Sequence, residues 1–171
     1  QPYFIHDIDS YKIVFVDGKY ASHLSQTTHD GIDICLMSYA LEKPKYRSVI
    51  ENYFNKIAEQ NSLISLNTAF VNEGAYIHIT KNKLVEKPIQ IIHFSTGNEA
   101  ALLLQPRNLI VVDENAQVQI IERHQSLTNN PTLTNCVTEI FAAKRGIVDY
   151  YKVQNDRDNA SLIDSTYIDQ G

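Results

Sequence analysis

One pattern, a polar turn followed by a strand, occurs three times in this chain. The copies are EGAYIHI at 73–79, ENAQVQIIE at 114–122 and RGIVDYY at 145–151. In each copy a small residue follows one or two polar ones, and apolar side chains then fall largely on every second position. Such alternation is typical of a strand with one buried face. The repetition predicts that the copies form the same side of successive coils of a β-solenoid, with loops absorbing the unequal spacing.

Strand-like alternation marks most of the chain after residue 66. The expected strands lie at 76–80, 89–95, 109–112, 118–122, 137–141, 148–153 and 162–168. The sequence is therefore that of a mainly β protein. An antiparallel sandwich shows the same alternation and regular turns, so periodicity alone leaves both architectures open.

The alternation also predicts which side chains face the core. Four apolar residues are expected to point inward: Ile77, Ile79, Val118 and Ile120. Their neighbours carry polar atoms, which cost free energy when they are buried without a hydrogen-bond partner. These neighbours are Tyr76, His78, Gln117 and Gln119. An antiparallel hairpin pattern through these strands would contradict the solenoid.

The N-terminal part begins with strand-like runs. Residues 12–16 are rich in β-branched and aromatic side chains and lead into Asp17-Gly18, a dipeptide suited to a tight turn. A second run, 32–39, is expected to pair with the first across a polar loop. We interpret the pair as a small β appendage.

The period then changes to that of a helix. Ser48 and Glu51 match a capping box, in which the two side chains satisfy otherwise unpaired backbone N–H groups. Apolar residues at helical spacing follow, which predicts one amphipathic helix from Val49 to Asn61. We therefore expect an N-terminal β/α region at 1–65 and a β-helix core at 66–171.

Composition narrows the possible partners and the location. The net charge is −5, from 15 basic and 20 acidic residues without long runs, so nucleic acid is not an expected partner. The apolar runs are far shorter than the roughly 20 residues of a membrane span, which predicts a soluble protein. Cys35 and Cys136 are the only cysteines, and no secretory signal precedes them. Reduced thiols and a cytoplasmic location are expected.

The sequence contains no recognised metal or catalytic motif. No histidine or cysteine pair has zinc-ligand spacing, and there is no nucleophile elbow and no phosphate-binding glycine loop. His78 and His93 lie in expected strands and His124 follows one, so we interpret each as a hydrogen-bonded strand or rim residue. Cys136 is interpreted as a small buried apolar group.

Glu122-Arg123-His124 places an acid, a base and an imidazole side by side. Neighbouring side chains on a strand point to opposite faces, so adjacency does not bring them together on one substrate. We predict no catalytic, cofactor-binding or metal-binding residue in this chain, and no enzymatic activity.

The alternative function class is a β-helix enzyme acting on carbohydrate. It would require carboxylates that meet across adjacent coils. The candidates in the coil region are Asp113, Glu114, Glu122 and Glu139. Asp113 and Glu114 fall in an expected turn, where solvated charge is the simpler interpretation.

Several longer motifs resemble one known family. They are VFVDGKY at 14–20, LNTAF at 66–70, VEKPIQIIHFSTG at 85–97, PRNLIVVDENAQVQIIE at 106–122 and TNCVTEI at 134–140. Together they are similar to SufD, the β-helix subunit of the Suf iron–sulfur cluster assembly complex. The resemblance covers most of the chain. It implies a right-handed parallel β-helix preceded by a small β hairpin and one amphipathic helix.

The resemblance also implies a function and partners. In this family the subunit pairs with its paralogue SufB, each of the two binds a copy of the ABC-type ATPase SufC, and clusters are built on the complex. The chain is therefore expected to be a noncatalytic scaffold subunit. The paralogous SufB is the alternative within the family, but SufB-like sequences typically read Glu-Gly-Cys where this chain reads Glu122-Arg123-His124.

The resemblance places the main partner contacts further along the family's sequence. The histidine at the boundary with SufB and the helices that hold the ATPase would fall beyond Gly171. The chain begins at Gln1 and not at methionine, and it stops directly after an alternating run, so we expect it to be a piece of a longer protein. No cofactor is expected in it, and handling of an iron–sulfur cluster is left to the complete complex. An uncovered last coil near 162–168 predicts that the chain self-associates through this end.

Overall fold

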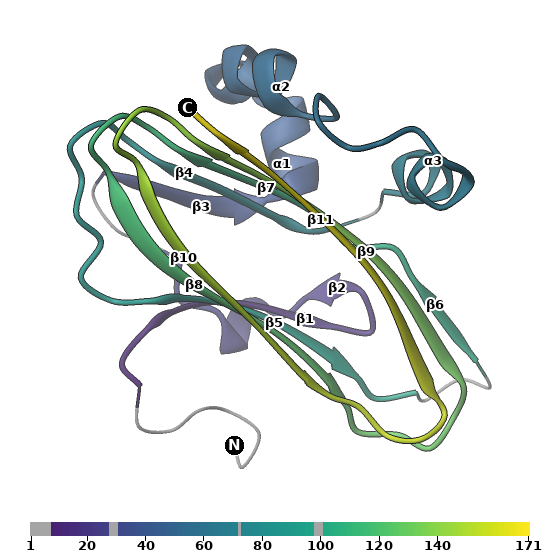
Figure 1. Ribbon diagram of the computed structural model, residues 1–171. Coiled ribbons are helices and arrows are strands. Elements are labelled where there is room, and N and C mark those ends of the chain that lie inside the picture. Colours follow the sequence, from purple (N-terminus) through teal and green to yellow (C-terminus); the bar gives the residue numbers. More distant parts are fainter. Residues whose placement is uncertain (1–7, 28–30, 72, 98–100) are drawn as a thin grey trace.

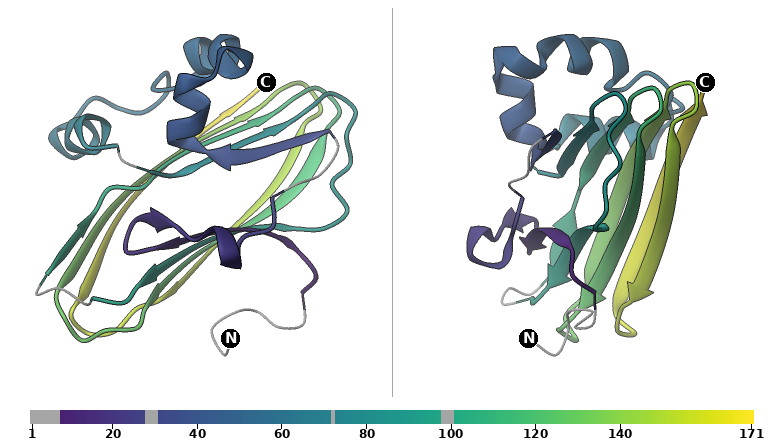
Figure 2. Two further views of the ribbon diagram at one scale, coloured as in Figure 1. Left: turned by 180° about the vertical axis from the view of Figure 1, so that it is seen from behind. Right: turned by 90° about the vertical axis from the view of Figure 1, so that its left-hand side faces the viewer.

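The computed structural model describes residues 8–27, 31–71, 73–97 and 101–171. The chain winds into a right-handed parallel β-solenoid of about three turns (Figure 1 and Figure 2). Strands account for 49% of the protein and helices for 17%, so the predicted mainly β class is confirmed. The strands that stack along the axis pair in parallel, which excludes the antiparallel sandwich.

Two sheets enclose an interior that we call the lumen, which side chains fill. Sheet A has the order β10-β8-β5-β1-β2, and sheet B has the order β11-β9-β7-β4-β3, with β6 beside β9. The strands of sheet A are β1 (Tyr11–Val16), β2 (Lys19–Tyr20), β5 (Ile89–Ser95), β8 (Gln117–Ser126) and β10 (Ile147–Asn155). Those of sheet B are β3 (Ile32–Leu36), β4 (Ala75–Ile79), β6 (Leu102–Leu104), β7 (Arg107–Val112), β9 (Thr132–Ala142) and β11 (Ala160–Gln170).

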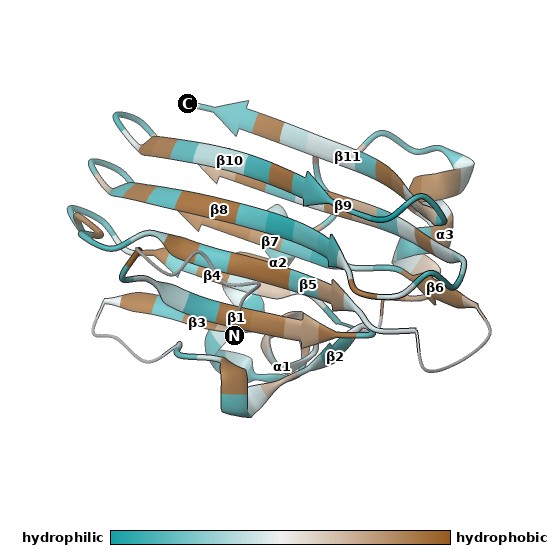
Figure 3. Cartoon of the chain, turned by 90° about the horizontal axis from the view of Figure 1, so that it is seen from below, coloured by the Kyte–Doolittle hydropathy of each residue, from teal (hydrophilic) through white to brown (hydrophobic). Residues whose placement is uncertain are grey.

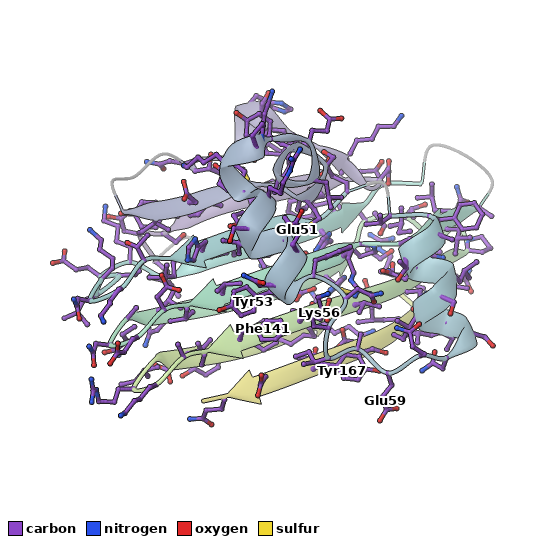
Figure 4. The ribbon with its side chains drawn as sticks, turned by 90° about the horizontal axis from the view of Figure 1, so that it is seen from above. Glu51, Tyr53, Lys56, Glu59, Phe141 and Tyr167 are labelled. Carbon is purple, nitrogen blue, oxygen red and sulfur yellow. The ribbon has the colours of Figure 1, made fainter. Side chains whose placement is uncertain are left out.

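Short helices cover the outer face of sheet B (Figure 4). They are α1 (Met37–Glu42), α2 (Arg47–Tyr53) and α3 (Ser62–Ala69), with 3-10 turns η1 (Ser22–Leu24) and η2 (Pro44–Tyr46) before and between them. Tyr53 of α2 packs on Phe141 of β9, with ring centroids 4.8 Å apart (Figure 4). No helix within the described residues is long and apolar enough to cross a membrane.

The corner that leads into sheet A explains part of the sequence repeat. Asn82, Asn115 and Arg145 all have positive φ, and they stack on one another in successive turns. The Asn115 amide donates to Asn82 at 2.9 Å, and Arg145 Nε donates to Asn115 Oδ1 at 2.5 Å. The second and third copies of the pattern therefore form the same side of successive coils. The first copy, 73–79, forms β4 in sheet B, so that part of the prediction was wrong.

The predicted inward residues are confirmed. Ile77, Ile79, Val118 and Ile120 are fully buried and belong to one apolar cluster in the lumen. Of their polar neighbours, Tyr76 alone is buried, because it faces outward from sheet B into the cluster beneath the helices. The solenoid strands begin at β4 and not at residue 66, since 66–69 lie in α3.

The expected pairing of the two N-terminal strands was wrong. β1 pairs in parallel with β5 in sheet A, whereas β3 pairs antiparallel with β4 in sheet B. Ile13 and Phe15 of β1 are buried in the same apolar cluster in the lumen, and so is Ile34 of β3. These strands cover the first coil, because its apolar cross-section needs a partner at that end. The region 12–16 is therefore part of the core and no appendage.

The predicted helix from Val49 to Asn61 was also wrong in its bounds. α2 begins at Arg47 without a side-chain cap, so the Ser48–Glu51 capping box does not form. α2 ends at Tyr53, where the chain turns through Asn55 at φ 59°. The backbone N–H groups that would have continued the helix bind a buried carboxylate instead, as described below.

Candidate functional site

The lumen changes from apolar to polar along β8. Val118 and Ile120 point inward, and at the same spacing so do Glu122 and His124, both buried. Figure 3 shows β8 becoming hydrophilic toward the tip of its arrow. The parallel register places His93 of β5 beside His124, and Lys152 of β10 beside Glu122. A charged cluster therefore lies inside the solenoid.

Glu122 is the centre of this cluster, and its side chain is 0% exposed. Its Oε1 accepts hydrogen bonds from His124 Nε2 at 2.9 Å and from the Cys136 thiol at 3.2 Å. Its Oε2 accepts from the Tyr150 hydroxyl and from Thr138 Oγ1, the latter at 3.4 Å. We call the following residues the lumen cluster: His93, Glu122, His124, Cys136, Thr138, Tyr150 and Lys152.

The surrounding groups keep Glu122 ionised. Burial alone would raise its pKa, but the hydrogen bond from His124 and the charge of Lys152 hold the pKa well below its usual value. Lys152 Nζ lies 3.5 Å from Glu122 Oε2 and also pairs with Asp164 of β11. Burial, followed by the charge of Glu122, raises the pKa of the Tyr150 hydroxyl. Tyr150 thus stays a donor to a carboxylate that stays charged.

His93 differs from its neighbours because one nitrogen lacks a partner. Its ring is stacked between Phe15 and His124, with centroids 5.0 and 4.7 Å away. Its Nε2 is buried, makes no hydrogen bond and lies 3.8 Å from Glu122 Oε1. Burial, with a smaller effect of the charge on His124, lowers the pKa of His93 from 6.5 to about 3. His93 is therefore a neutral imidazole.

The sequence interpretation of Glu122-Arg123-His124 needs correction. Glu122 and His124 are two positions apart on one strand, so they share the inner face and are hydrogen-bonded, whereas Arg123 bonds to Gln125 at 2.9 Å. The spacing Glu-x-His on an expected strand was the signal that could have shown this. His93 could not be found from spacing, because it comes from a different coil.

Cys136 has a more polar environment than the sequence suggested. It is fully buried, but its thiol donates to Glu122 and lies 3.9 Å from Thr138 Oγ1. Burial, and then the charge of Glu122, raises the pKa of Cys136 well above its usual value. The thiol is therefore a neutral donor to Glu122.

A second buried carboxylate, Glu139, faces the opposite way. It points outward from β9 and is covered by the segment between α2 and α3, which we call the 55–58 linker. Four backbone N–H groups of this linker donate to it, at 2.8, 2.9, 3.1 and 3.3 Å. Arg107 Nη2 donates at 2.6 Å, and the Arg107 guanidinium also lies over the Phe54 ring at 5.2 Å. Both ionic side chains are 0% exposed.

The four candidate carboxylates do not converge. Glu122 lies in the lumen and Glu139 beneath the 55–58 linker. Asp113 and Glu114 lie at the outer corner, where Asp113 meets His78 at 3.1 Å and Glu114 meets Lys81 at 2.6 Å. Arg145 also pairs with Glu114, at 2.7 Å. The pair of facing carboxylates that glycoside hydrolysis requires is not formed by these four residues.

Comparison with known proteins gives a consistent result over the whole chain. The family model "SUF system FeS cluster assembly, SufBD core domain" matches residues 93–171, and the model "SufBD protein N-terminal region" matches residues 4–91. An iron–sulfur cluster assembly SufBD family protein from Synechocystis sp. is 27% identical over 99% of this chain and 39% of its own length.

Two relatives from Bacillus subtilis are also similar. The iron–sulfur cluster assembly protein SufD is 28% identical over 74% of this chain and 28% of its own length. The iron–sulfur cluster assembly protein SufB is 34% identical over 58% of this chain and 21% of its own length. The chain therefore spans at most 39% of the length of these relatives.

Proposed function

Since the chain belongs to the SufBD family, with a role in iron–sulfur cluster assembly, we propose that it is part of a noncatalytic scaffold subunit of a SufBCD-type complex. The resemblance to a SufD- or SufBD-type protein found in the motifs is thus confirmed. The observation that carries the proposal is the match of the N-terminal and core family models, in this order, to the two halves of the chain.

The arrangement of charged groups supports a scaffold over the carbohydrate-active alternative. The buried carboxylates Glu122 and Glu139 lie on opposite sides of sheet B, and each is engaged by hydrogen bonds within the protein. The corner carboxylates are paired with basic side chains. No pair of these four carboxylates is positioned to act on two sides of a glycosidic bond.

Within the family, the lumen cluster supports SufD over SufB. The residue after Arg123 is His124, whereas SufB-like sequences typically carry a cysteine at this position. His124 points into the lumen and bonds to Glu122. A cytoplasmic location is part of the proposal, and it agrees with Cys35 and Cys136, which are both free.

The proposed partners are a SufB-like paralogue and a SufC-like ABC-type ATPase. The test is to tag the complete protein in its own cells, purify it gently and identify what is retained, with an untagged strain as the control. Recovery of a second β-helix subunit together with an ABC-type ATPase is the expected result. Reproducible recovery of the tagged protein with neither of them would overturn the proposal.

Self-association through the last coil stays a prediction. β10 and β11 each pair on one side only in the described sheets, and Ile168 is 62% exposed. Exposed strand edges of this kind can pair with a second copy of the chain. Light scattering of the purified chain over a range of concentrations should show a dimer. An Ile168→Lys variant should shift it toward monomer, and a monomer at every concentration would contradict the prediction.

A further inference from the structure

Three potential metal ligands meet in the lumen. His93, Glu122 and His124 each offer one ligand atom, these atoms all lie within 4.8 Å of one another, and all three residues are buried. From this geometry we propose that the lumen cluster binds one divalent transition-metal ion, of the Zn²⁺ or Fe²⁺ type, through His93, Glu122 and His124. This inference does not depend on the proposed scaffold function.

The donor set fits this class of ion. Two imidazole nitrogens and one carboxylate oxygen form catalytic zinc sites and non-haem iron sites. With metal–ligand bonds of about 2.0–2.2 Å, ligand atoms of a tetrahedral site lie about 3.3–3.6 Å apart. The two contacts to Glu122 Oε1, 2.9 Å from His124 and 3.8 Å from His93, lie on either side of this range. The two histidine rings are stacked with centroids 4.7 Å apart, so they would have to rotate for all three ligand atoms to reach it.

The unpartnered nitrogen of His93 supports the site independently. A buried polar atom without a hydrogen bond costs free energy, and the described protein supplies no donor or acceptor to His93 Nε2. A bound cation would accept its lone pair. His124 would bind through Nε2 in the tautomer that carries its hydrogen on Nδ1. Each imidazole would then present a nitrogen lone pair to the ion.

The side chains around Glu122 are placed to orient its carboxylate as a metal ligand. Tyr150 and Thr138 both donate to Glu122 Oε2, which leaves Oε1 as the oxygen facing the histidines. Such hydrogen bonds orient a ligating carboxylate. Asp164 pairs with Lys152, which offsets the positive charge nearest the proposed ion. The Cys136 thiol also donates to Oε1, at 3.2 Å.

A pocket gives a route to the site. It opens at the end of the lumen beside β1 and β2, and its lining includes Phe15, His93, Leu104, Gln105 and Thr134. His93 is thus shared between the pocket and the cluster. Of the three proposed ligand residues, His93 is the one that lines this pocket, so an ion entering from this end would reach His93 first.

The test is metal titration of the purified chain after removal of bound metal with a chelator. Co²⁺ binding is followed by visible absorption and Zn²⁺ binding by calorimetry. We expect one ion per chain. His93→Asn, Glu122→Gln and His124→Asn should each weaken binding at least about 100-fold, because each removes a ligand. Tyr150→Phe should weaken it by about 10-fold, since it removes only a supporting hydrogen bond.

The matched control is His78→Asn. His78 lies on the outer side of β4 and pairs with Asp113, so this variant should bind as the parent chain does. Circular dichroism of each variant establishes that it is folded before titration. No binding by the folded parent chain would overturn the proposal, and so would equal affinities in the His93→Asn and His78→Asn variants. The linear spacing of histidines and cysteines predicts that the chain binds no metal ion, whereas the proposed site predicts one ion per chain. The titration distinguishes these two outcomes.

Discussion

Glu122 and Glu139 are both fully buried, but they are held in different ways. Glu139 faces out of sheet B and is bound by four backbone N–H groups and by Arg107. Glu122 faces into the lumen, and its hydrogen bonds come from side chains, those of His124, Cys136, Thr138 and Tyr150. One carboxylate anchors the helical segment to the solenoid. The other belongs to a group of titratable side chains.

The source of the hydrogen-bond donors, backbone or side chain, distinguishes the structural role of Glu139 from the candidate site at Glu122. Backbone donors are fixed by the course of the chain, so the 55–58 linker can hold one carboxylate in one place. Side-chain donors can rotate. Unpartnered buried nitrogens lie beside both carboxylates, Nε2 of His93 near Glu122 and Nε and Nη1 of Arg107 near Glu139, but only the imidazole nitrogen has a lone pair to offer a cation. Preorganised but incompletely satisfied polar groups are what a binding site presents before its ligand arrives. Burial alone would not have distinguished the two glutamates.

The largest expected effect is that of Glu139→Ala. It leaves the Arg107 guanidinium, whose side chain is 0% exposed, without its carboxylate, and it removes the acceptor of four N–H groups. Breaking a buried ion pair in this way costs about 3–5 kcal/mol. Urea denaturation should show a fall of this size in the free energy of unfolding. Hydrogen exchange in α2 and the 55–58 linker should accelerate.

The control for this variant removes both charges. Glu139→Leu combined with Arg107→Met leaves no unpaired ion, so it should recover a substantial part of the stability lost in Glu139→Ala. A loss below about 1 kcal/mol in Glu139→Ala would show that the linker is held mainly by other contacts.

Glu122→Gln is expected to cost less stability. The amide keeps the shape and one acceptor oxygen of the carboxylate, and Lys152 keeps its pairing with Asp164. A loss of about 1–3 kcal/mol is expected, as for a buried hydrogen-bonding group that is left partly unsatisfied. The same urea titration measures it. A loss greater than that of Glu139→Ala would reverse our ranking of the two carboxylates.

The lumen should also make the fold sensitive to acid. The pKa of His93 is about 3 in the folded chain and 6.5 ordinarily, so below pH 6.5 the unfolded chain binds the extra proton. The free energy of unfolding should therefore decrease by about 1.5 kcal/mol between pH 6.5 and 5 through this residue. His93→Phe keeps a ring between Phe15 and His124 and removes the titration. An unchanged pH slope in this variant would contradict the interpretation.

The sequence predicted those elements that are specified by residues close together in the chain. The period-two pattern of Ile77, Ile79, Val118 and Ile120 identified the inner face of the solenoid, because one face of each strand is apolar. The parallel pairing of β1 with β5 was not predictable, since it joins segments far apart in the chain. The local antiparallel pair of β1 with β2 does form, but the expected pairing of 12–16 with 32–39 does not.

The candidate site was missed for the same reason. Glu122 and His124 share a strand, but the approach of His93 depends on the register between two coils. The early end of α2 likewise depends on Glu139, which lies 84 positions from Asn55. The local pattern through 54–61 predicts a helix. In the structure the backbone N–H groups of 55–58 donate to the buried Glu139 carboxylate and not to carbonyl groups of a longer α2.

The smallest expected effect concerns the N-terminal ends of α3 and α2. Asn61 caps α3, because its Oδ1 accepts from the N–H groups of Leu63 and Ile64, both at 3.0 Å. Asn61→Ala should lower the free energy of unfolding by about 1 kcal/mol, the usual value of such a cap. Ser48 makes no cap in α2, so Ser48→Ala should leave stability unchanged within about 0.5 kcal/mol. Urea denaturation of both variants measures the difference: equal losses would mean that the Ser48 side chain caps the start of α2 after all.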